Sequence, residues 1–443
     1  MIFSASQLNL TVTRSWFFFV LLVGAIGGFY STFASELPAA DGLVSNEVAA
    51  RYGLHRAWFS HVRVDSTRFR IASWTLDNDQ LFALSTDGSV HAMDAETGEM
   101  VWTADIAGRN ATTVGMSVNA DYVAVLSATR LHLLDRSDGR LRWSREIGGA
   151  PNSAPAIGNR YAYVALLSGR VEGYQLDDPA ASAWQYQSNG RIFHSPVTTG
   201  NVVSWPTDEG FLYVSSVENP QPLYRIQTND EIVTAPAGLA PFLYVASLDG
   251  YLYCFHEFTG KEIWRYSTGF AVTSKPAIVG AMAFVASEKA ALHAVDSKNG
   301  NRLWRTDGAG DFVAMGANYI YGLAPYGTLV ALDKTTGSIV GRIATTPEHS
   351  AVVNDQSDRI FLVNERGSVQ CLREIGAIEP TWYRRQKSEE PPAEDHEEDE
   401  SSPFHQEAPD TTEDAVDSGA KDAAGNSLET EEPSDIFDDD NPF

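Results

Sequence analysis

Three histidines occupy one register of the sequence, each three residues before an aspartate. The pairs are His91 with Asp94, His132 with Asp135, and His293 with Asp296. Imidazole is a common metal ligand, so a metal site is the first hypothesis. Other copies of the pattern carry different residues there, namely Glu172, Tyr253 and Gln370. Because repeated copies hold one register far apart, we expect a packing role for these histidines and no metal.

The repeated aspartates are the next residues that could do chemistry. They are Asp94, Asp135, Asp296 and Asp333. Each stands where an alternating segment gives way to a turn, so its carboxylate is expected to accept hydrogen bonds within that turn. No Ser/His/Asp or Cys/His arrangement can be assembled, and no phosphate-binding loop occurs. The sequence therefore predicts no catalytic residue.

The chain has two cysteines, Cys254 and Cys371, at another shared register. Alanine fills this position in other copies, as at Ala92 and Ala294. A cysteine there is expected to behave as a small buried apolar residue. The two belong to the fifth and eighth copies, which is too far apart for a disulfide bond.

These residues share a repeat marked by "DAETGEMVW", Asp94 to Trp102. The position of its Trp recurs at intervals of 37 to 41 residues along the chain: Trp102, Trp143, Trp184, Tyr224, Trp264, Trp304, Gly341 and Trp382. In most copies, three alternating segments separated by Gly, Asn and Asp precede the segment that carries the Trp. Such alternation marks short antiparallel strands. Repeats of ~40 residues with four strands stack around an axis, so we predict an all-β, eight-bladed β-propeller.

The repeat residues are expected to have structural roles, with each Trp on the outermost strand filling the wedge between blades. They are Trp58, Asp94, Gly98, Trp102, Asp135, Gly139, Trp143, Trp184, Gly260, Trp264, Asp296, Gly300, Trp304, Asp333, Gly337 and Trp382. The segment "RAWFSHVRV", Arg56 to Val64, reads as one more outer strand. We expect it to join the last blade and remove an exposed edge. Whether the strand of Trp58 or that of Trp382 is the outer one stays open.

The whole chain divides into five parts. Before the propeller at 56–386, we expect a cytoplasmic segment at 1–14, a transmembrane segment at 15–35 and a linker at 36–55, in which Val44 to Gly53 form a short helix. After the propeller, we expect a disordered acidic tail at 387–443. The tail has 21 acidic residues against two lysines, within a net charge of -26. High charge with few apolar residues predicts disorder. Such a tail would serve either as a docking arm for a partner or only to keep the protein in solution. No basic face is expected, which argues against nucleic acid as a partner.

The apolar segment from Ser15 to Ser35 contains no charged residue and follows Arg14. About 20 apolar residues can span a bilayer as a helix, and the preceding positive charge favours a cytoplasmic N-terminus. A cleaved signal peptide is the alternative. Both predict an exported protein that faces the periplasm. A cytosolic WD40-like propeller is a further alternative, against which the apolar segment argues.

The unit "FLYVASLDGYLYCFHEFTGKEIW", Phe242 to Trp264, resembles the repeat of the PQQ-like β-propellers. Such repeats occur in quinoprotein dehydrogenases and in BamB, a subunit of the bacterial outer-membrane β-barrel assembly machinery. The resemblance covers about Arg56 to Gln386.

The quinoprotein enzymes use pyrroloquinoline quinone (PQQ) as their cofactor. Membership of that group implies an adjacent Cys–Cys pair, a set of Ca²⁺ ligands and a catalytic Asp. This chain has no adjacent cysteines. A BamB-type lipoprotein implies an N-terminal Cys, which is also missing. We therefore expect a non-catalytic, monomeric scaffold without cofactor or metal. It would bind other envelope proteins and attach to the inner membrane through its N-terminal helix. BamB-like outer-membrane protein assembly is one form of this function, and a PQQ-dependent oxidoreductase is the alternative.

Overall fold

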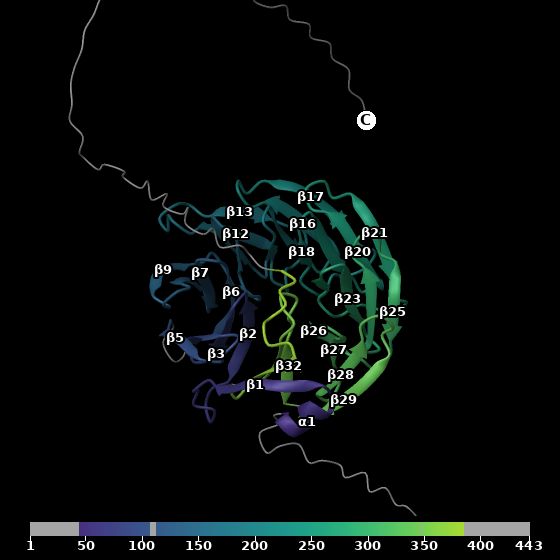
Figure 1. Ribbon diagram of the computed structural model, residues 1–443. Coiled ribbons are helices and arrows are strands. Elements are labelled where there is room, and N and C mark those ends of the chain that lie inside the picture. Colours follow the sequence, from purple (N-terminus) through teal and green to yellow (C-terminus); the bar gives the residue numbers. More distant parts are fainter. Residues whose placement is uncertain (1–43, 107–111, 347, 385–443) are drawn as a thin grey trace, which may run out of the picture. The chain divides into compact units, whose positions relative to one another are not determined.

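Eight four-stranded antiparallel sheets surround a central channel in the part of the chain that the structure describes (Figure 1). The structure is a computed structural model that describes residues 44–106, 112–346 and 348–384. This confirms the predicted eight-bladed β-propeller. Seven blades follow the chain order of their strands, and the eighth combines strands from both ends of the described chain.

Blades 1 to 4 follow one another along the first half of the ring. Blade 1 has β2 (Ile71–Asp77), β3 (Gln80–Ser85), β4 (Ser89–Asp94) and β5 (Met100–Asp105). Blade 2 has β6 (Thr113–Val118), β7 (Tyr122–Ser127), β8 (Arg130–Asp135) and β9 (Leu141–Glu146). Blade 3 has β10 (Ala156–Ile157), β11 (Tyr161–Ala165), β12 (Arg170–Gln175) and β13 (Trp184–Gln187). Blade 4 has β14 (Val197–Thr198), β15 (Val202–Pro206), β16 (Phe211–Ser216) and β17 (Pro222–Gln227).

Blades 5 to 8 complete the ring. Blade 5 has β18 (Ala237–Leu239), β19 (Phe242–Ala246), β20 (Tyr251–His256) and β21 (Glu262–Ser267). Blade 6 has β22 (Ala277–Val279), β23 (Met282–Ser287), β24 (Ala291–Asp296) and β25 (Arg302–Thr306). Blade 7 has β26 (Asp311–Met315), β27 (Tyr319–Ala324), β28 (Thr328–Asp333) and β29 (Ile339–Ala344). Blade 8 has β30 (His349–Val352), β31 (Ile360–Asn364), β32 (Ser368–Glu374) and β1 (Leu54–His61).

The burial of the strands changes with distance from the channel. The middle strands β3 and β4 are buried at almost every residue, because neighbouring blades cover both faces of the sheet. The outer strand β5 buries only Trp102 and exposes most of its other residues. Stacked flat sheets diverge at larger radius, so the outer strands need a large side chain to fill the gap between them.

The ring closes through β1, which pairs with β32 along its whole length. Trp58 lies opposite Cys371 in this pairing, at the position that Trp102 takes opposite Ala92 in blade 1. The strand of Trp58 is therefore the outer one. Trp382 does not lie on an outer strand, because it comes after the end of β32 and its backbone pairs with Ser357 as an isolated bridge. Trp382 follows Gly341 by 41 residues, which matches the spacing of the repeat although no outer strand is present at Trp382.

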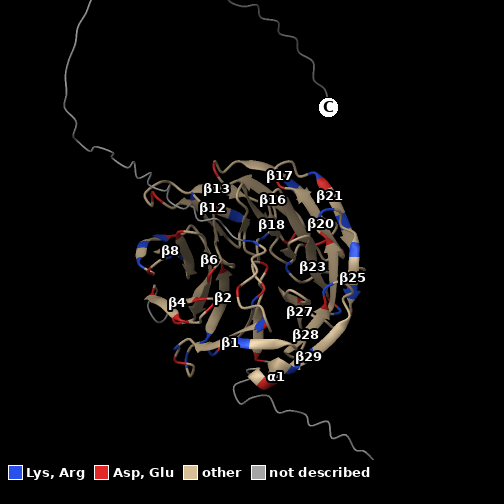
Figure 2. Cartoon of the chain, in the orientation of Figure 1, with Lys and Arg blue, Asp and Glu red and all other residues tan. Residues whose placement is uncertain are grey.

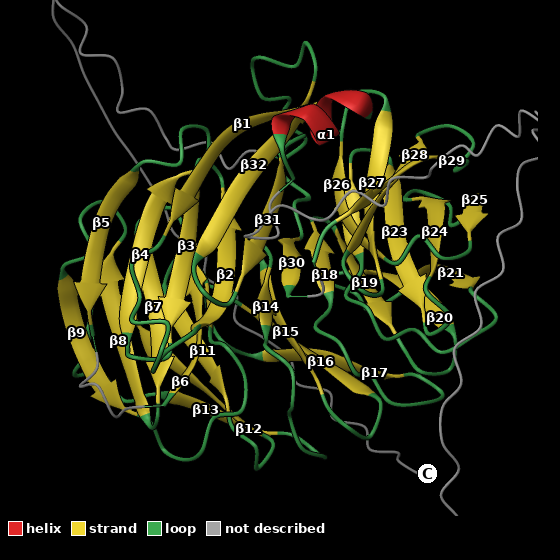
Figure 3. Cartoon of the chain, turned by 90° about the horizontal axis from the view of Figure 1, so that it is seen from below, coloured by secondary structure: helices red, strands yellow, loops and turns green. Residues whose placement is uncertain are grey.

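The predicted helix before the ring is α1 (Asn46–Arg51). The Ser45 side chain caps its N-terminus by accepting a hydrogen bond from the backbone of Val48. Gly53 follows its end with a φ of 73°, a left-handed conformation that glycine adopts without strain. Figures 1 and 3 place α1 beside β1, at the edge of the ring.

The helix fills a place that the repeat leaves open in blade 7. Gly341 stands there at the Trp position, and a Cβ atom added to it would lie 2.6 Å from Cδ1 of Tyr52. The Tyr52 ring thus occupies space that an indole takes in other blades. Blade 8 has no glycine hairpin for such an indole to cover, because its outer strand comes from the other end of the ring.

The expected transmembrane segment at 15–35 and the acidic tail lie outside the described residues. Within the described ranges, no helix is long and apolar enough to cross a membrane.

Candidate functional site

The Trp of the repeat connects each blade to the next one. Trp102 lies on β5 of blade 1, and its Nε1 donates a hydrogen bond of 2.7 Å to the carbonyl of Arg136 in blade 2. A Cβ atom at Gly139 would lie 2.5 Å from Cε3 of Trp102, so only glycine leaves room for the ring. The indole therefore packs on the β8–β9 turn of the neighbouring blade, at 8% exposure.

The same contact recurs around the ring. The indoles and the turn glycines they cover are Trp58 with Gly98, Trp264 with Gly300, and Trp304 with Gly337. Tyr224 replaces the Trp in blade 4 and covers Gly260. Trp143 keeps the hydrogen bond, at 2.8 Å to the carbonyl of Leu176. Trp184 instead joins an aromatic cluster with Tyr163, Tyr186 and Trp205.

The repeated aspartates hold their own turns. Asp94 accepts hydrogen bonds from the backbone of Glu96 and Thr97 at 2.9 and 2.7 Å. Hydrogen bonds from Thr335 and Thr336 lower the pKa of Asp333 to about 2. Asp296 follows the same arrangement, while Asp135 accepts a hydrogen bond from Arg142. The structure does not bring these carboxylates together, since each belongs to a different blade.

In blades 2, 5 and 8, a charged residue directly follows the repeat position that Asp94 takes in blade 1, and the sequence analysis missed its role. Arg136 in blade 2 forms an ion pair with Asp77 at the end of β2 in blade 1. Glu257 in blade 5 accepts hydrogen bonds from Thr199 and Asn201 of blade 4, each at 2.8 Å. Charged residues at one repeat position thus bind the preceding blade. Their shared register was the signal that could have revealed this.

Glu374 in blade 8 repeats this contact with blade 7. Its carboxylate accepts hydrogen bonds from the backbone of Asn318 and Tyr319, and from the Tyr321 hydroxyl at 3.2 Å. Burial and the neighbouring carboxylate raise the pKa of the Tyr321 phenol. This buried carboxylate therefore has structural partners in the adjacent blade.

The three histidines are buried in separate blades. Burial lowers the pKa of His91 and His132, and it lowers the pKa of His293 to about 4. Nδ1 of His293 lies 3.0 Å from the Tyr266 hydroxyl. Neutral imidazoles with local hydroxyl partners suit packing between strands. Among the described residues, no group of three or more His, Cys, Asp or Glu residues could hold a metal ion.

Both cysteines are buried and unpaired. Burial raises the pKa of the Cys254 thiol to about 12 and also raises the pKa of Cys371. A thiol in this state is a poor nucleophile at neutral pH. Their position in blades 5 and 8 agrees with the packing role expected from the repeat.

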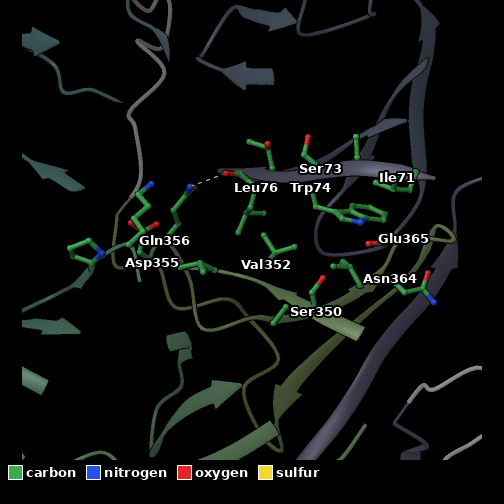
Figure 4. Close-up of a pocket in the computed structure, with 17 residues that line it drawn as sticks. Ile71, Ser73, Trp74, Leu76, Ser350, Val352, Asp355, Gln356, Asn364 and Glu365 are labelled. Carbon is green, nitrogen blue, oxygen red and sulfur yellow. Dashed lines mark hydrogen bonds between the residues drawn. The ribbon is translucent and has the colours of Figure 1, made fainter. Parts of the chain in front are cut away.

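The inner strands of the ring border a cavity, which we call the channel cavity. This cavity of about 580 Å³ lies between β2 of blade 1 and β30 of blade 8, with Lys275 of blade 6 beside it. Figure 4 shows Trp74 reaching from β2 toward the side of Glu365 and Asn364. The Trp74 Nε1 and the Ser73 hydroxyl are buried without a hydrogen-bond partner in the described residues. Both atoms are closed off from the open space of the cavity, so they do not offer hydrogen bonds to a molecule inside it.

Gln356 joins the two blades that form the cavity. Its Nε2 donates to the carbonyl of Leu76 at 3.1 Å, and its Oε1 accepts from the backbone of Asn78 at 2.7 Å. A smaller cavity of about 210 Å³ adjoins it, where Arg384 lies 3.7 Å from Asp355. The residue types here support polar binding and offer no paired acid and base.

A buried arginine strengthens the junction between the last blade and the first. Arg359 of blade 8 is fully buried, and its guanidinium binds the Glu96 carboxylate of blade 1 at 2.9 Å. It also contacts Asp358 and donates to the carbonyls of Ala377 and Ile378. A buried cation needs such partners to offset its lost hydration. Both signs of charge are spread around the ring (Figure 2).

Similar folds are known at low sequence identity. BamB from Moraxella catarrhalis has a TM-score of 0.57 and 19% identity, covering 72% of this chain and 97% of that chain. The computationally designed Ika8 protein has a TM-score of 0.56 and 14% identity, covering 72% and 97%. The C-terminal WD40 domain of Sif2 has a TM-score of 0.56 and 11% identity, covering 72% and 98%. These likenesses show the fold alone.

A search of curated proteins found no match. A family model described as outer membrane protein assembly factor BamB matches residues 63–158, 86–226 and 229–398. The matches cover the blades and the contacts between them. The chain therefore belongs to the BamB family of PQQ-like β-propellers.

Proposed function

We propose that this chain is an exported, membrane-anchored scaffold that binds other envelope proteins without catalysing a reaction. The observation that carries the proposal is the match of the BamB family model to all eight blades, from residue 63 onward. Its finer form is a role in outer-membrane protein assembly, as the name of the family describes. The proposal places the ring on the periplasmic side of the inner membrane, held by residues 15–35.

The contacts of the charged side chains support the function of a scaffold. Arg359 and Glu374 bind neighbouring blades, and Asp94 holds a turn. Such contacts stabilise a rigid ring, and a rigid ring can hold its loops in fixed positions for a partner. One such loop carries Tyr326, which is 88% exposed at the β27–β28 turn with a φ of 67°. An exposed aromatic residue at a turn suits a protein contact.

The test is crosslinking and co-purification from native envelopes. Three forms would be compared: the full chain, the chain truncated after Gln386, and the full chain with Tyr326→Ala. Barrel or assembly components recovered with both the full and the truncated chain would support binding by the ring. A partner lost on truncation would assign binding to the tail. Recovery of no specific envelope protein by any form would contradict the proposal.

A PQQ-dependent oxidoreductase is the second candidate. The observation in its favour is the channel cavity of about 580 Å³. Ligand sites in proteins are commonly cavities of this size. Quinone binding and substrate oxidation would distinguish this candidate from the scaffold.

A further inference from the structure

Exposed aliphatic side chains gather around the end of α1. Ile378 is 68% exposed and Ile375 is 63% exposed, more than any other aliphatic side chain in the described ranges. We call Ile375 and Ile378 the α1 patch. Single exposed apolar residues are ordinary, but a cluster of them marks an interaction surface.

Contacts with the residues after α1 place these side chains in one region. The backbone of Ile375 donates a hydrogen bond of 2.9 Å to the carbonyl of Gly53. Tyr52, the residue before Gly53, packs against Gly341 on β29. The turn after β32 and the outer strand of blade 7 meet at the end of the helix.

The backbone that carries Ile378 is firmly held. Its carbonyl accepts hydrogen bonds from Arg359 at 2.8 Å and from Arg373 at 2.7 Å. Because Arg359 is fully buried, this turn is fixed to the core of blade 8. An exposed isoleucine on a fixed turn cannot fold back to cover itself.

The charges around the α1 patch are balanced. Arg51 and Arg373 carry positive charge near it, and Glu47 and Glu379 carry negative charge. Such a surface has no preference for a strongly charged partner. Its binding energy would come from burial of the isoleucines.

The short sequence before α1 limits the distance between the α1 patch and a membrane that residues 15–35 would span. Eight residues, Glu36 to Leu43, separate the apolar segment 15–35 from Val44. Eight extended residues reach at most about 28 Å. Val44 is buried beside α1, in the same core cluster as Tyr52 and Ala49. If residues 15–35 span the bilayer, α1 must lie within that distance of the membrane surface.

We propose that the α1 patch inserts into the membrane interface and sets the orientation of the propeller on the lipid surface. The inference rests on the membrane anchor in the proposed function. The occupant is the bilayer itself, with Ile375 and Ile378 at the level of the headgroups. Blade 8 then faces the membrane, and blade 4, half a ring away, faces the opposite side.

The test uses the absence of reactive native thiols, since Cys254 and Cys371 are both buried. The full chain with Ile378→Cys is labelled with the dye NBD and reconstituted in phosphatidylcholine vesicles that contain a nitroxide lipid. Ile375→Cys provides a second position in case the first variant fails to fold. Leu223→Cys on β17 of blade 4, where the side chain is 41% exposed, is the matched control.

We expect a blue shift and quenching by roughly a factor of two at positions 375 and 378, and neither change at 223. Equal signals at all three positions would overturn the inference. A blue shift without quenching would also overturn it, because a protein would then cover the α1 patch. Carbonate extraction separates the two proposals: a chain that stays in the vesicles without quenching contradicts only the α1 patch, and a released chain contradicts the anchor as well.

Discussion

At the residue scale, an indole and a glycine form the unit that joins the blades. The ring of Trp102 needs the missing side chain of Gly139, and its Nε1 needs the carbonyl of Arg136. The same pair of residues recurs around the ring, as at Trp58 with Gly98 and at several other positions. The Trp and the Gly of one repeat therefore belong to two different interfaces.

Removal of one indole should destabilise the ring. We expect Trp102→Ala to lower the free energy of unfolding by about 3–5 kcal/mol, because it leaves a cavity and loses a buried hydrogen bond. Denaturant unfolding followed by circular dichroism measures this change. Trp382→Ala is the control, and a clearly smaller loss is expected there because Trp382 lies outside the outer strands. Equal losses for the two variants would contradict the role of the indole.

A buried histidine should make the ring sensitive to acid. The pKa of His293 in the folded protein, about 4, lies below its ordinary value of 6.5, so the unfolded chain binds the proton first as the pH falls. The contribution of neutral His293 to the free energy of unfolding is fully present above pH 6.5. It is lost as the pH falls toward the pKa of the folded protein, by up to about 3 kcal/mol.

The substitution His293→Gln tests this effect, since blade 8 has Gln370 at the same register. The variant should lose less stability than the native chain between about pH 7 and about pH 4.5. Urea unfolding at the two pH values measures the difference. An unchanged pH dependence would show that His293 does not contribute to acid sensitivity.

At the element scale, α1 replaces the indole that blade 7 lacks. Tyr52 fills the space above Gly341, and Gly53 binds the turn after β32. The helix is therefore part of the junction between blades 7 and 8. A segment that lies outside the repeat in sequence completes the repeat in space.

A double-mutant cycle tests this replacement. Gly341→Trp restores the usual residue of the repeat, yet we expect it to destabilise the chain by about 1–3 kcal/mol because the indole overlaps Tyr52. The double variant Tyr52→Ala/Gly341→Trp should recover at least about 1 kcal/mol of that loss. Thermal and denaturant unfolding of all four chains give the coupling. Additive losses would mean that the two positions do not compete for one space.

At the scale of the whole molecule, the ring depends on pairing between residues far apart in sequence. β1 pairs with β32, and Arg359 of the last blade binds Glu96 of the first. A closed ring removes the exposed edges that separate sheets would have. Opening at this junction would expose the edge of β32 and the face of blade 8 that packs on blade 1.

Hydrogen exchange can measure how firmly the junction is closed. We expect the backbone amides of β1 that bond to β32 to exchange as slowly as those between β31 and β32, because one cooperative unit protects them all. Exchange measured by mass spectrometry on the full chain resolves these strands. Fast exchange in β1 alone would show that the first strand is only loosely attached.

Sequence alone predicted much of this architecture and less of its contacts. The alternation of the strands and the Trp spacing gave the blades, and Trp58 revealed the closing strand. Spacing misled at Trp382, because a turn of matching length follows β32. The pairing of Tyr52 with Gly341 and the channel cavity could not be predicted, since they join residues from blades that no local pattern connects.

Direct measurement of quinone binding would separate a scaffold from an enzyme. The full chain would be dialysed to equilibrium against PQQ with Ca²⁺, and dye-linked oxidation of alcohols and sugars would then be assayed. A scaffold predicts no saturable PQQ binding and no dye reduction above that of the free quinone. Stoichiometric PQQ binding with catalytic dye reduction, lost on Trp74→Ala in the channel, would contradict the proposed function.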